Sequence, residues 1–293
     1  MSVSPDYRGL VELLRLCEEA VFDSAWLMDH LTWGPNSAVF ECWTALSALS
    51  RETSRIHLGP FFLRNSFRNP ALVAKMAATL DTISEGRLEL GLGAGWKEDE
   101  HRTYGYRYDS AAERIGRLDE AAAIVKLMWS GKPATFRGKY YQISDAVCRP
   151  EPVQPGGPPL WIGGGGERLT LKVAAKHANV CNFSGYPIDL QVFQKKLRAL
   201  EHHCQSVGRR SEDIVKSVTL ELVLGKNEED ARRNEREAPP SVAPEERFVG
   251  TPSDCISFLQ EFIDSGASYF MLHIEDLLPS FRLFEKEVMP SFQ

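Results

Sequence analysis

Short apolar runs alternate with longer amphipathic segments along nearly the whole chain, and this alternation most limits the possible folds. Apolar runs without a polar face are typical of strands covered by protein on both sides, and apolar residues at helical spacing indicate helices between them. The expected strands are residues 24–28, 55–64, 88–92, 160–163, 180–183, 215–224 and 269–274. The expected helices are 7–20, 38–50, 70–83, 111–129, 167–177, 190–207, one opened by Thr251-Pro252, and a terminal one. This order predicts an α/β fold with a parallel sheet.

The chain has 293 residues, which suits a single domain built as a barrel of eight strand-helix units, because such barrels need about 250 residues. Two stretches leave the regular pattern. Residues 135–158 are rich in glycine, tyrosine and proline, which predicts a hairpin and an extended loop inserted into the barrel. Residues 226–248 are polar, which predicts one short helix and a loop. Seven strands also suit a doubly wound open sheet, so periodicity alone leaves both architectures open.

Composition removes several classes of function. The net charge is −6, so a nucleic-acid partner is not expected. No apolar run approaches the roughly 20 residues of a membrane helix, and no signal region opens the chain, so we expect a cytoplasmic protein without a membrane partner. The six cysteines form no C-x-x-C pair and no mixed cluster with histidine, which predicts no metal site.

A histidine follows the first expected strand, in the segment Asp29-His30-Leu31-Thr32-Trp33. Barrel enzymes place catalytic groups at the carboxyl ends of their strands. A histidine there can hydrogen-bond a substrate or act as acid or base near neutral pH. The alternative interpretation is a structural Asp-His pair that closes the loop.

Two glycine segments also follow strands. The segment Gly91-Leu92-Gly93-Ala94-Gly95 does not fit the dinucleotide fingerprint, but its glycines let a flat ring approach the backbone. The acids that follow it, up to Glu100, are typical of a solvated helix start. Gly163 to Gly166 lie between a strand and a helix, where backbone N–H groups and the helix dipole favour a phosphate. A merely flexible turn is the alternative for this second segment.

Taken together, the motifs resemble the luciferase-like flavin-dependent oxidoreductases over about residues 6–275. The matching segments are Phe22 to His30, Arg68 to Ala71, Ala78 to Arg87, Gly91 to Trp96 with Glu100, Tyr140-Tyr141, Pro159 to Gly164, and Gly250 to Pro252. The resemblance implies a luciferase-like (β/α)8 TIM barrel. The resemblance is greatest to the branch of the family that uses the deazaflavin coenzyme F420. This coenzyme carries hydride to or from a small organic substrate.

The resemblance also implies roles for particular residues. His30 and Glu100 would flank the reactive face of the ring, with Glu100 as proton donor or acceptor and Trp33 near the substrate. The residues implied to bind the coenzyme are Asp29, Phe61, Phe62, Gly163, Gly164, Gly165 and Gly166. A non-proline cis peptide is expected at Phe61-Phe62, and a homodimer is expected.

Two alternatives to the F420 enzyme stay open. One is a monooxygenase that uses flavin mononucleotide (FMN) supplied by a separate flavin reductase. The other is a non-catalytic, coenzyme-binding paralogue, motivated by the start of the chain. Family members begin with an apolar strand, whereas here Met1 to Pro5 lead almost directly into the first helix. The first strand is therefore expected to be short, with Met1 to Ser4 as a stub, or missing.

Overall fold

The computed structural model describes residues 6–33, 38–183, 189–238, 247–274 and 279–292. The chain divides into two compact units, Met1–Val180 and Cys181–Gln293, and each is described by itself. The expected stub strand at Met1 to Ser4 lies outside the described residues.

The strands of the first unit run parallel. They are β1 (Ser24–Met28), β2 (His57–Phe61), β3 (Leu63–Arg64), β4 (Leu90–Gly93) and β7 (Leu160–Gly163). β1 pairs with β2, and β4 pairs with both β3 and β7. A parallel bridge between Leu58 and Leu88 joins the two groups. Because the strands are parallel, their carboxyl ends, and the loops that follow them, lie at one edge.

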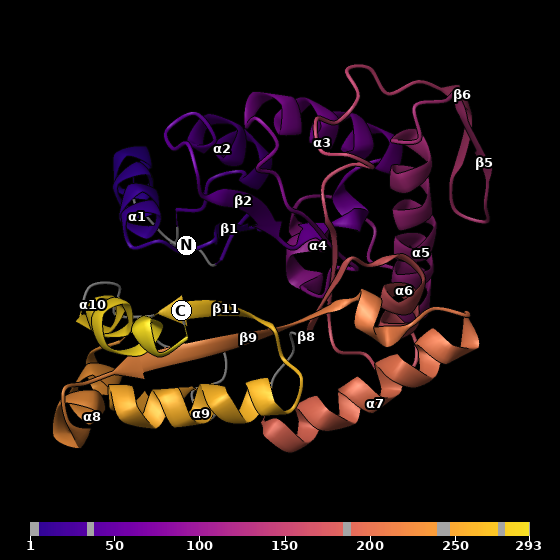
Figure 1. Ribbon diagram of the computed structural model, residues 1–293. Helices are drawn as coiled ribbons and strands as arrows, with labels where there is room; N and C mark the ends of the chain where they lie inside the picture. The colour runs from indigo at the N-terminus through magenta and orange to yellow at the C-terminus, as the bar shows by residue number, and fades with distance from the viewer. Residues whose placement is uncertain (1–5, 34–37, 184–188, 239–246, 275–278, 293) are drawn as a thin grey trace. The chain divides into compact units, whose positions relative to one another are not determined.

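Helices alternate with these strands along the chain (Figure 1). They are α1 (Tyr7–Glu19), α2 (Cys42–Leu49), α3 (Pro70–Ile83), α4 (Glu98–Thr103), α5 (Ala111–Met128) and α6 (Thr170–His177). α5 packs against both α3 and α6. Local signals fix several starts: the Asn69 side chain caps α3 with Pro70 in its first turn, and Ser110 and Glu113 form a capping box on α5.

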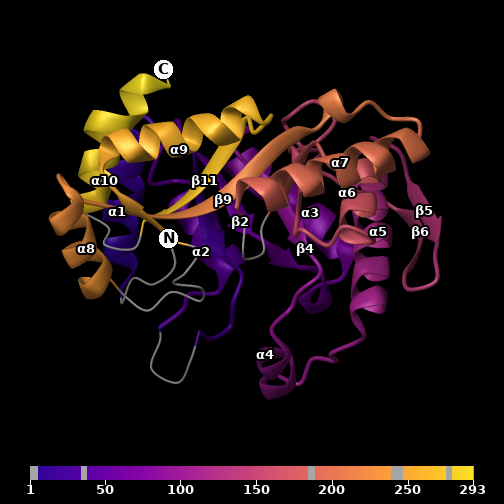
Figure 2. The same cartoon turned by 90° about the horizontal axis from the view of Figure 1, so that it is seen from below.

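The predicted hairpin is present as an antiparallel pair, β5 (Ala134–Arg137) and β6 (Gln142–Ala146). It lies beside α5 in both views (Figures 1 and 2). One carboxylate on α5 fastens its turn: Glu120 accepts hydrogen bonds from the backbone N–H groups of Lys139, Tyr140 and Tyr141 at 2.7–2.9 Å. The inserted hairpin is therefore tied to the helix that precedes it.

Two other helices fasten loops in the same way. Glu18 on α1 accepts from three consecutive N–H groups, residues 54–56, at 2.6–3.1 Å. Asp81 on α3 accepts from the N–H groups of Val153 and Gln154 at 2.7 and 2.9 Å. A carboxylate that accepts several backbone donors satisfies groups that a loop would otherwise leave unpaired.

The second unit is built around one long strand, β9 (Val215–Leu224). Its partners are β8 (Val180–Phe183), β10 (Phe248–Gly250) and β11 (Tyr269–Ile274). The helices are α7 (Leu190–Ser206), α8 (Glu228–Glu237), α9 (Pro252–Asp264) and α10 (Pro279–Leu283), and α10 runs on into the π-helical turn Phe284–Val288. α9 runs alongside β9 (Figures 1 and 2), and the predicted cap at Thr251 is a complete capping box. None of the helices in the described ranges has the length and hydropathy to cross a membrane.

Several element boundaries differ from the predictions. The expected strand 55–64 is two strands, because the chain changes from pairing with β1 to pairing with β4 at Phe62. The helix expected at 38–50 begins only at Cys42, where Glu41 caps it. The helix expected from residue 167 begins at Thr170. Helix α4 and strand β10 were not predicted, because six- and three-residue elements show no clear periodicity.

Most of the charged residues of α5 are half-buried and bind neighbouring segments. Asp119, for example, accepts hydrogen bonds from Lys176 at 2.6 Å and His177 at 2.8 Å, both on α6. Burial raises its pKa, but these two partners outweigh that effect and lower the pKa of Asp119 to about 2.

Candidate active site

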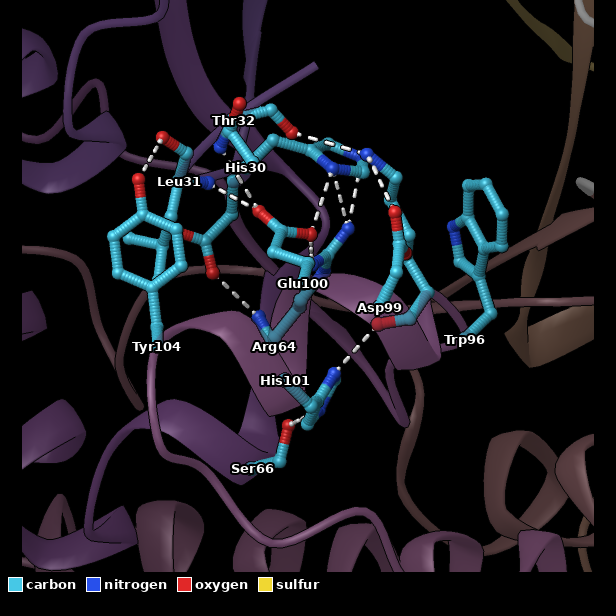
Figure 3. A network of polar contacts seen from close by, with 12 residues as sticks. His30, Leu31, Thr32, Arg64, Ser66, Trp96, Asp99, Glu100, His101 and Tyr104 are labelled. Carbon is cyan, nitrogen blue, oxygen red and sulfur yellow. Dashed lines mark hydrogen bonds and ion pairs between the residues drawn. The ribbon is translucent and has the colours of Figure 1, made fainter. Parts of the chain in front are cut away.

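His30 and Glu100 meet in the first unit although 69 residues separate them in the sequence (Figure 3). His30 follows β1, and Glu100 lies on α4, which follows β4. The imidazole Nδ1 lies 3.1 Å from Oε2 of Glu100. The exposed fraction is 7% for His30 and 0% for Glu100. The structure therefore brings together, and buries, the two residues predicted to carry the chemistry.

Glu100 is held by donors from three segments. Its Oε1 accepts from the backbone N–H groups of Leu31 and Thr32, the second at 3.2 Å. Its Oε2 accepts from the guanidinium of Arg64. The expectation of a solvated helix start holds for Glu98 and Asp99, which are exposed, but it is wrong for Glu100. The reason is that the side chain of Glu100 points back toward the loop after β1.

Arg64 is the member of this cluster that the sequence predictions missed. It ends β3, and only 3% of it is exposed. Its Nη2 lies 2.5 Å from Nδ1 and 2.9 Å from Nε2 of His30. Burial lowers the pKa of Arg64 to about 10, against the opposite effect of Asp29 and Asp99, so the guanidinium stays charged at neutral pH. A charged residue at the end of an apolar strand was the signal that could have identified it.

The protonation state of His30 differs from the expectation of an acid or base near neutral pH. Burial, and then the charges of Arg64 and Lys97, lower the pKa of His30 to about 3. The imidazole is therefore neutral at physiological pH. A neutral imidazole has one donor nitrogen and one acceptor nitrogen, so it can orient a polar group without carrying charge.

Aromatic rings surround the exposed side of His30. The ring of Trp33 lies 4.5 Å from the imidazole, edge to face, and Trp96 lies 6.1 Å from it. Trp96 is 59% exposed. Lys97 donates to the carbonyl oxygen of Thr32 at 3.2 Å and lies over the Trp33 ring at 5.4 Å. Trp33 thus lies beside His30, and its place near the substrate stays a prediction.

The carboxylate of Asp29 binds neighbouring residues of the protein through both of its oxygens. Its Oδ2 accepts from the backbone N–H of Arg64 at 2.7 Å, and the Arg68 guanidinium binds both of its oxygens at 2.8 and 3.0 Å. Asp29 thus fixes the start of the loop that carries His30, and both of its oxygens are engaged.

The side chain of Phe62 fills the space beside two glycines at strand ends, Gly91 and Gly163. The peptide bond between Phe61 and Phe62 is cis, as predicted. A Cβ on Gly163 would lie 2.5 and 2.6 Å from Phe62 ring atoms, and one on Gly91 would lie 2.5 Å from Cδ1 of the same ring. The Phe62 ring therefore fills the space beside Gly91, and the approach of a coenzyme ring to this glycine stays a prediction. This ring also joins the start of the Gly163–Gly166 loop to β4.

The loop Gly163–Gly166 presents unused donors. Within the described ranges, the backbone N–H groups of Gly164, Gly165 and Gly166 donate no hydrogen bond to the protein. Gly164 has a φ of +121°, a conformation that favours glycine. The carbonyl of Gly166 accepts from Leu171 at 3.1 Å, a wide turn that delays the start of α6 to Thr170. Three adjacent free donors at a strand end suit an anion.

Comparisons with known proteins agree on one family. A model of the luciferase-like monooxygenase family matches residues 1–268. A protein of Mycolicibacterium fortuitum named F420-dependent glucose-6-phosphate dehydrogenase is 33% identical, over 82% of this chain and 72% of its own length. A Microbacterium testaceum protein of the same name is 31% identical, over 88% and 77%.

Solved structures show the fold. The F420-dependent tetrahydromethanopterin reductase of Methanopyrus kandleri aligns with a TM-score of 0.83 at 19% identity, covering 100% of this chain and 98% of its own. An F420-dependent secondary alcohol dehydrogenase aligns with a TM-score of 0.85 at 19% identity, and the alignment covers 98% of this chain and 95% of that protein. A long-chain alkane monooxygenase aligns with a TM-score of 0.83 at 17% identity, and the alignment covers 98% of this chain and 84% of that protein. The predicted luciferase-like (β/α)8 barrel fold is thereby confirmed.

Proposed function

Because the chain belongs to the luciferase-like monooxygenase family, we propose that it is an oxidoreductase that transfers a hydride between coenzyme F420 and a small organic substrate. Two relatives above 30% identity are named F420-dependent dehydrogenases, which supports this coenzyme over flavin mononucleotide. The observation that carries the proposal is the buried His30–Glu100 pair at the carboxyl edge of the parallel strands.

The residues of the first unit fit such a coenzyme. The free N–H groups of Gly164, Gly165 and Gly166 would hold its phosphate, since consecutive backbone donors bind anions without a charged side chain. Phe61 and Phe62 would back its ring. When bound, the deazaflavin supplies a two-electron hydride donor or acceptor.

His30 would hydrogen-bond the oxygen at the reacting carbon of the substrate, or a ring oxygen. Glu100 fixes the imidazole through the 3.1 Å contact with Nδ1, so Nε2 is the nitrogen for that role. Because Nη2 of Arg64 lies 2.9 Å from Nε2, a substrate group would replace this contact when it binds. Proton transfer by Glu100 itself would compete with the bonds that it already accepts from Leu31, Thr32 and Arg64. Trp33 would form an apolar wall beside the substrate.

A binding titration tests the coenzyme. Purified protein is titrated with oxidised F420 and, separately, with FMN, and fluorescence is followed. We expect tight binding of F420 and weak binding of FMN. Turnover is then assayed with glucose 6-phosphate and with secondary alcohols, the substrates in the names of its relatives and a structural neighbour. A His30→Gln variant should lose about 10²–10³-fold in kcat/KM while it keeps coenzyme affinity. Full turnover of this variant would refute the role of His30.

An FMN-dependent monooxygenase is the second candidate. The description of the family and the similarity to the alkane monooxygenase favour it. Turnover without oxygen separates the two functions, since a monooxygenase stops and a hydride-transfer enzyme continues. Tight FMN binding with strictly oxygen-dependent turnover would support the monooxygenase, with a separate flavin reductase as its partner. Coenzyme binding without turnover of any substrate would support a non-catalytic paralogue.

We also propose that the chain is a single-domain, cytoplasmic homodimer. Six free cysteines, five of them buried, suit a reducing compartment. Light scattering after gel filtration tests the dimer, and limited proteolysis tests whether the two compact units separate. A monomeric mass, or two stable fragments, would contradict these proposals.

A further inference from the structure

We propose that Arg64 is a positioning residue for this reaction: its guanidinium joins His30 and Glu100 into one unit and holds the imidazole as an uncharged hydrogen-bonding group. The catalytic part of this inference rests on the proposed function. The part that concerns the charge of His30 can be tested without any coenzyme.

The geometry of the guanidinium supports this role. Nη1 of Arg64 donates to Glu100, and Nη2 lies 2.9 Å from Nε2 of His30, which is the acceptor nitrogen because Nδ1 faces the Glu100 carboxylate. Its backbone N–H is fixed by Asp29, so the side chain starts from an anchored position (Figure 3 shows the cluster). A planar, charged fork that binds two partners at once orders both of them, and lysine cannot reproduce this geometry.

The charges that face His30 come from four segments. Arg64 approaches from β3, Lys97 from the segment before α4, and Glu100 from α4 itself. Asp29, the preceding residue, is paired with Arg68. Asp99 is turned toward Lys97, at 3.7 Å from its ammonium group. Burial and the two adjacent cations, Arg64 and Lys97, therefore disfavour a proton on the imidazole, against the opposite effect of the Glu100 carboxylate.

This arrangement has a catalytic consequence. An uncharged imidazole in the resting enzyme can donate or accept a hydrogen bond, but it does not store the proton that accompanies hydride transfer. Turnover should then show no step from His30 protonation across about pH 5–8, the range where an ordinary histidine titrates.

The test is a pH titration of the His30 imidazole by NMR in the coenzyme-free protein. The variants are Arg64→Met, which removes the charge at similar length, and Arg64→Lys, which keeps the charge without the fork. Arg87→Met is the matched control, because Arg87 is also buried but donates to the carbonyl oxygens of Ser50 and Ile56. His30→Gln assigns the resonance.

We expect no titration of His30 near neutral pH in the wild type, because its pKa lies at about 3. In Arg64→Met the midpoint should rise toward the ordinary value of 6.5, by at least about one unit, which is a tenfold change in protonation. In Arg64→Lys the midpoint of the His30 titration should rise less. Arg87→Met should lower stability and leave His30 unchanged.

A midpoint that is the same in the wild type and in Arg64→Met would overturn the proposal. If Arg64→Met does not fold, the same comparison is made with Arg64→Gln, which removes the charge but keeps a hydrogen-bond donor. An unchanged midpoint in Arg64→Gln would be equally decisive. The second readout is the pH dependence of kcat/KM: Arg64→Met should gain a step below neutral pH that the wild type lacks. A shifted NMR midpoint without F420 turnover would contradict the proposed function alone.

Discussion

The contact between Gly163 and Phe62 allows a quantitative test of how the strand ends are packed. An added Cβ at Gly163 would have Phe62 ring atoms as its three nearest neighbours, two of them at 2.5 and 2.6 Å. Atoms this close must move apart, and overpacking in a filled site costs about 1–3 kcal/mol. Gly163 does not have a positive φ, so backbone strain adds nothing. We therefore expect Gly163→Ala to lower the free energy of unfolding by about 1–3 kcal/mol.

The second substitution shows whether the ring is the cause. Phe62→Ala removes the ring, so Gly163→Ala should no longer lower the free energy of unfolding in that background. Phe62 is half-buried, so its loss alone should cost less than the about 3–5 kcal/mol of a fully buried phenylalanine. The double variant should be no less stable than Phe62→Ala alone. The coupling energy between the two sites should then lie within about 0.5–3 kcal/mol.

Gly91 provides the control for this cycle. A Cβ there would meet the backbone oxygen of Pro60 as well as the ring of Phe62. Removing the ring relieves only part of this conflict, so Phe62→Ala should rescue Gly91→Ala poorly. Urea unfolding followed by circular dichroism measures all five variants. Additive effects of Gly163→Ala and Phe62→Ala would refute the reasoning, because they would show that the ring does not occupy the space beside Gly163.

Three further predictions concern charge and backbone. Glu100→Gln leaves a buried guanidinium without its carboxylate and should cost about 3–5 kcal/mol in urea unfolding, whereas the exposed Glu98→Gln should cost almost nothing; equal losses would contradict the buried pair. Gly164→Ala and Gly208→Ala both place alanine at a positive φ, but only the first should weaken F420 binding in a fluorescence titration. Asp119, with its pKa lowered from 3.8 to about 2, should contribute about 2 kcal/mol above pH 4. That contribution is lost as pH falls through 2, so urea midpoints of Asp119→Asn and wild type should converge in acid.

Several strands and helices could be predicted from the sequence with their bounds. β1, α3, β7, β9 and β11 have the predicted bounds. Apolar residues dominate these segments, and residues such as Asn69-Pro70 mark a boundary through the neighbouring backbone alone. The cluster of His30, Glu100 and Trp33 was predicted from a family resemblance together with the rule on strand ends.

What the sequence did not reveal depends on partners distant in the chain. Arg64 ends an apolar run, and nothing near it in the sequence shows that it reaches His30 and Glu100, which lie 34 and 36 residues away. The neutral state of His30 follows from the same neighbours and from burial. The ring of Phe62 against Gly163 likewise requires that β3 and β7 flank the same strand, β4.

The carboxylates that hold backbone N–H groups have a practical consequence for protein engineering. Glu18, Asp81, Glu100 and Glu120 each fasten a loop in the first unit. Nothing in the sequence distinguishes this loop-holding role from that of the other acids behind the net charge of −6. A redesign that neutralises acids to change solubility or isoelectric point would therefore remove the anchors of four loops unless these positions are kept. Acids without such backbone contacts, such as Glu98, are the ones to change.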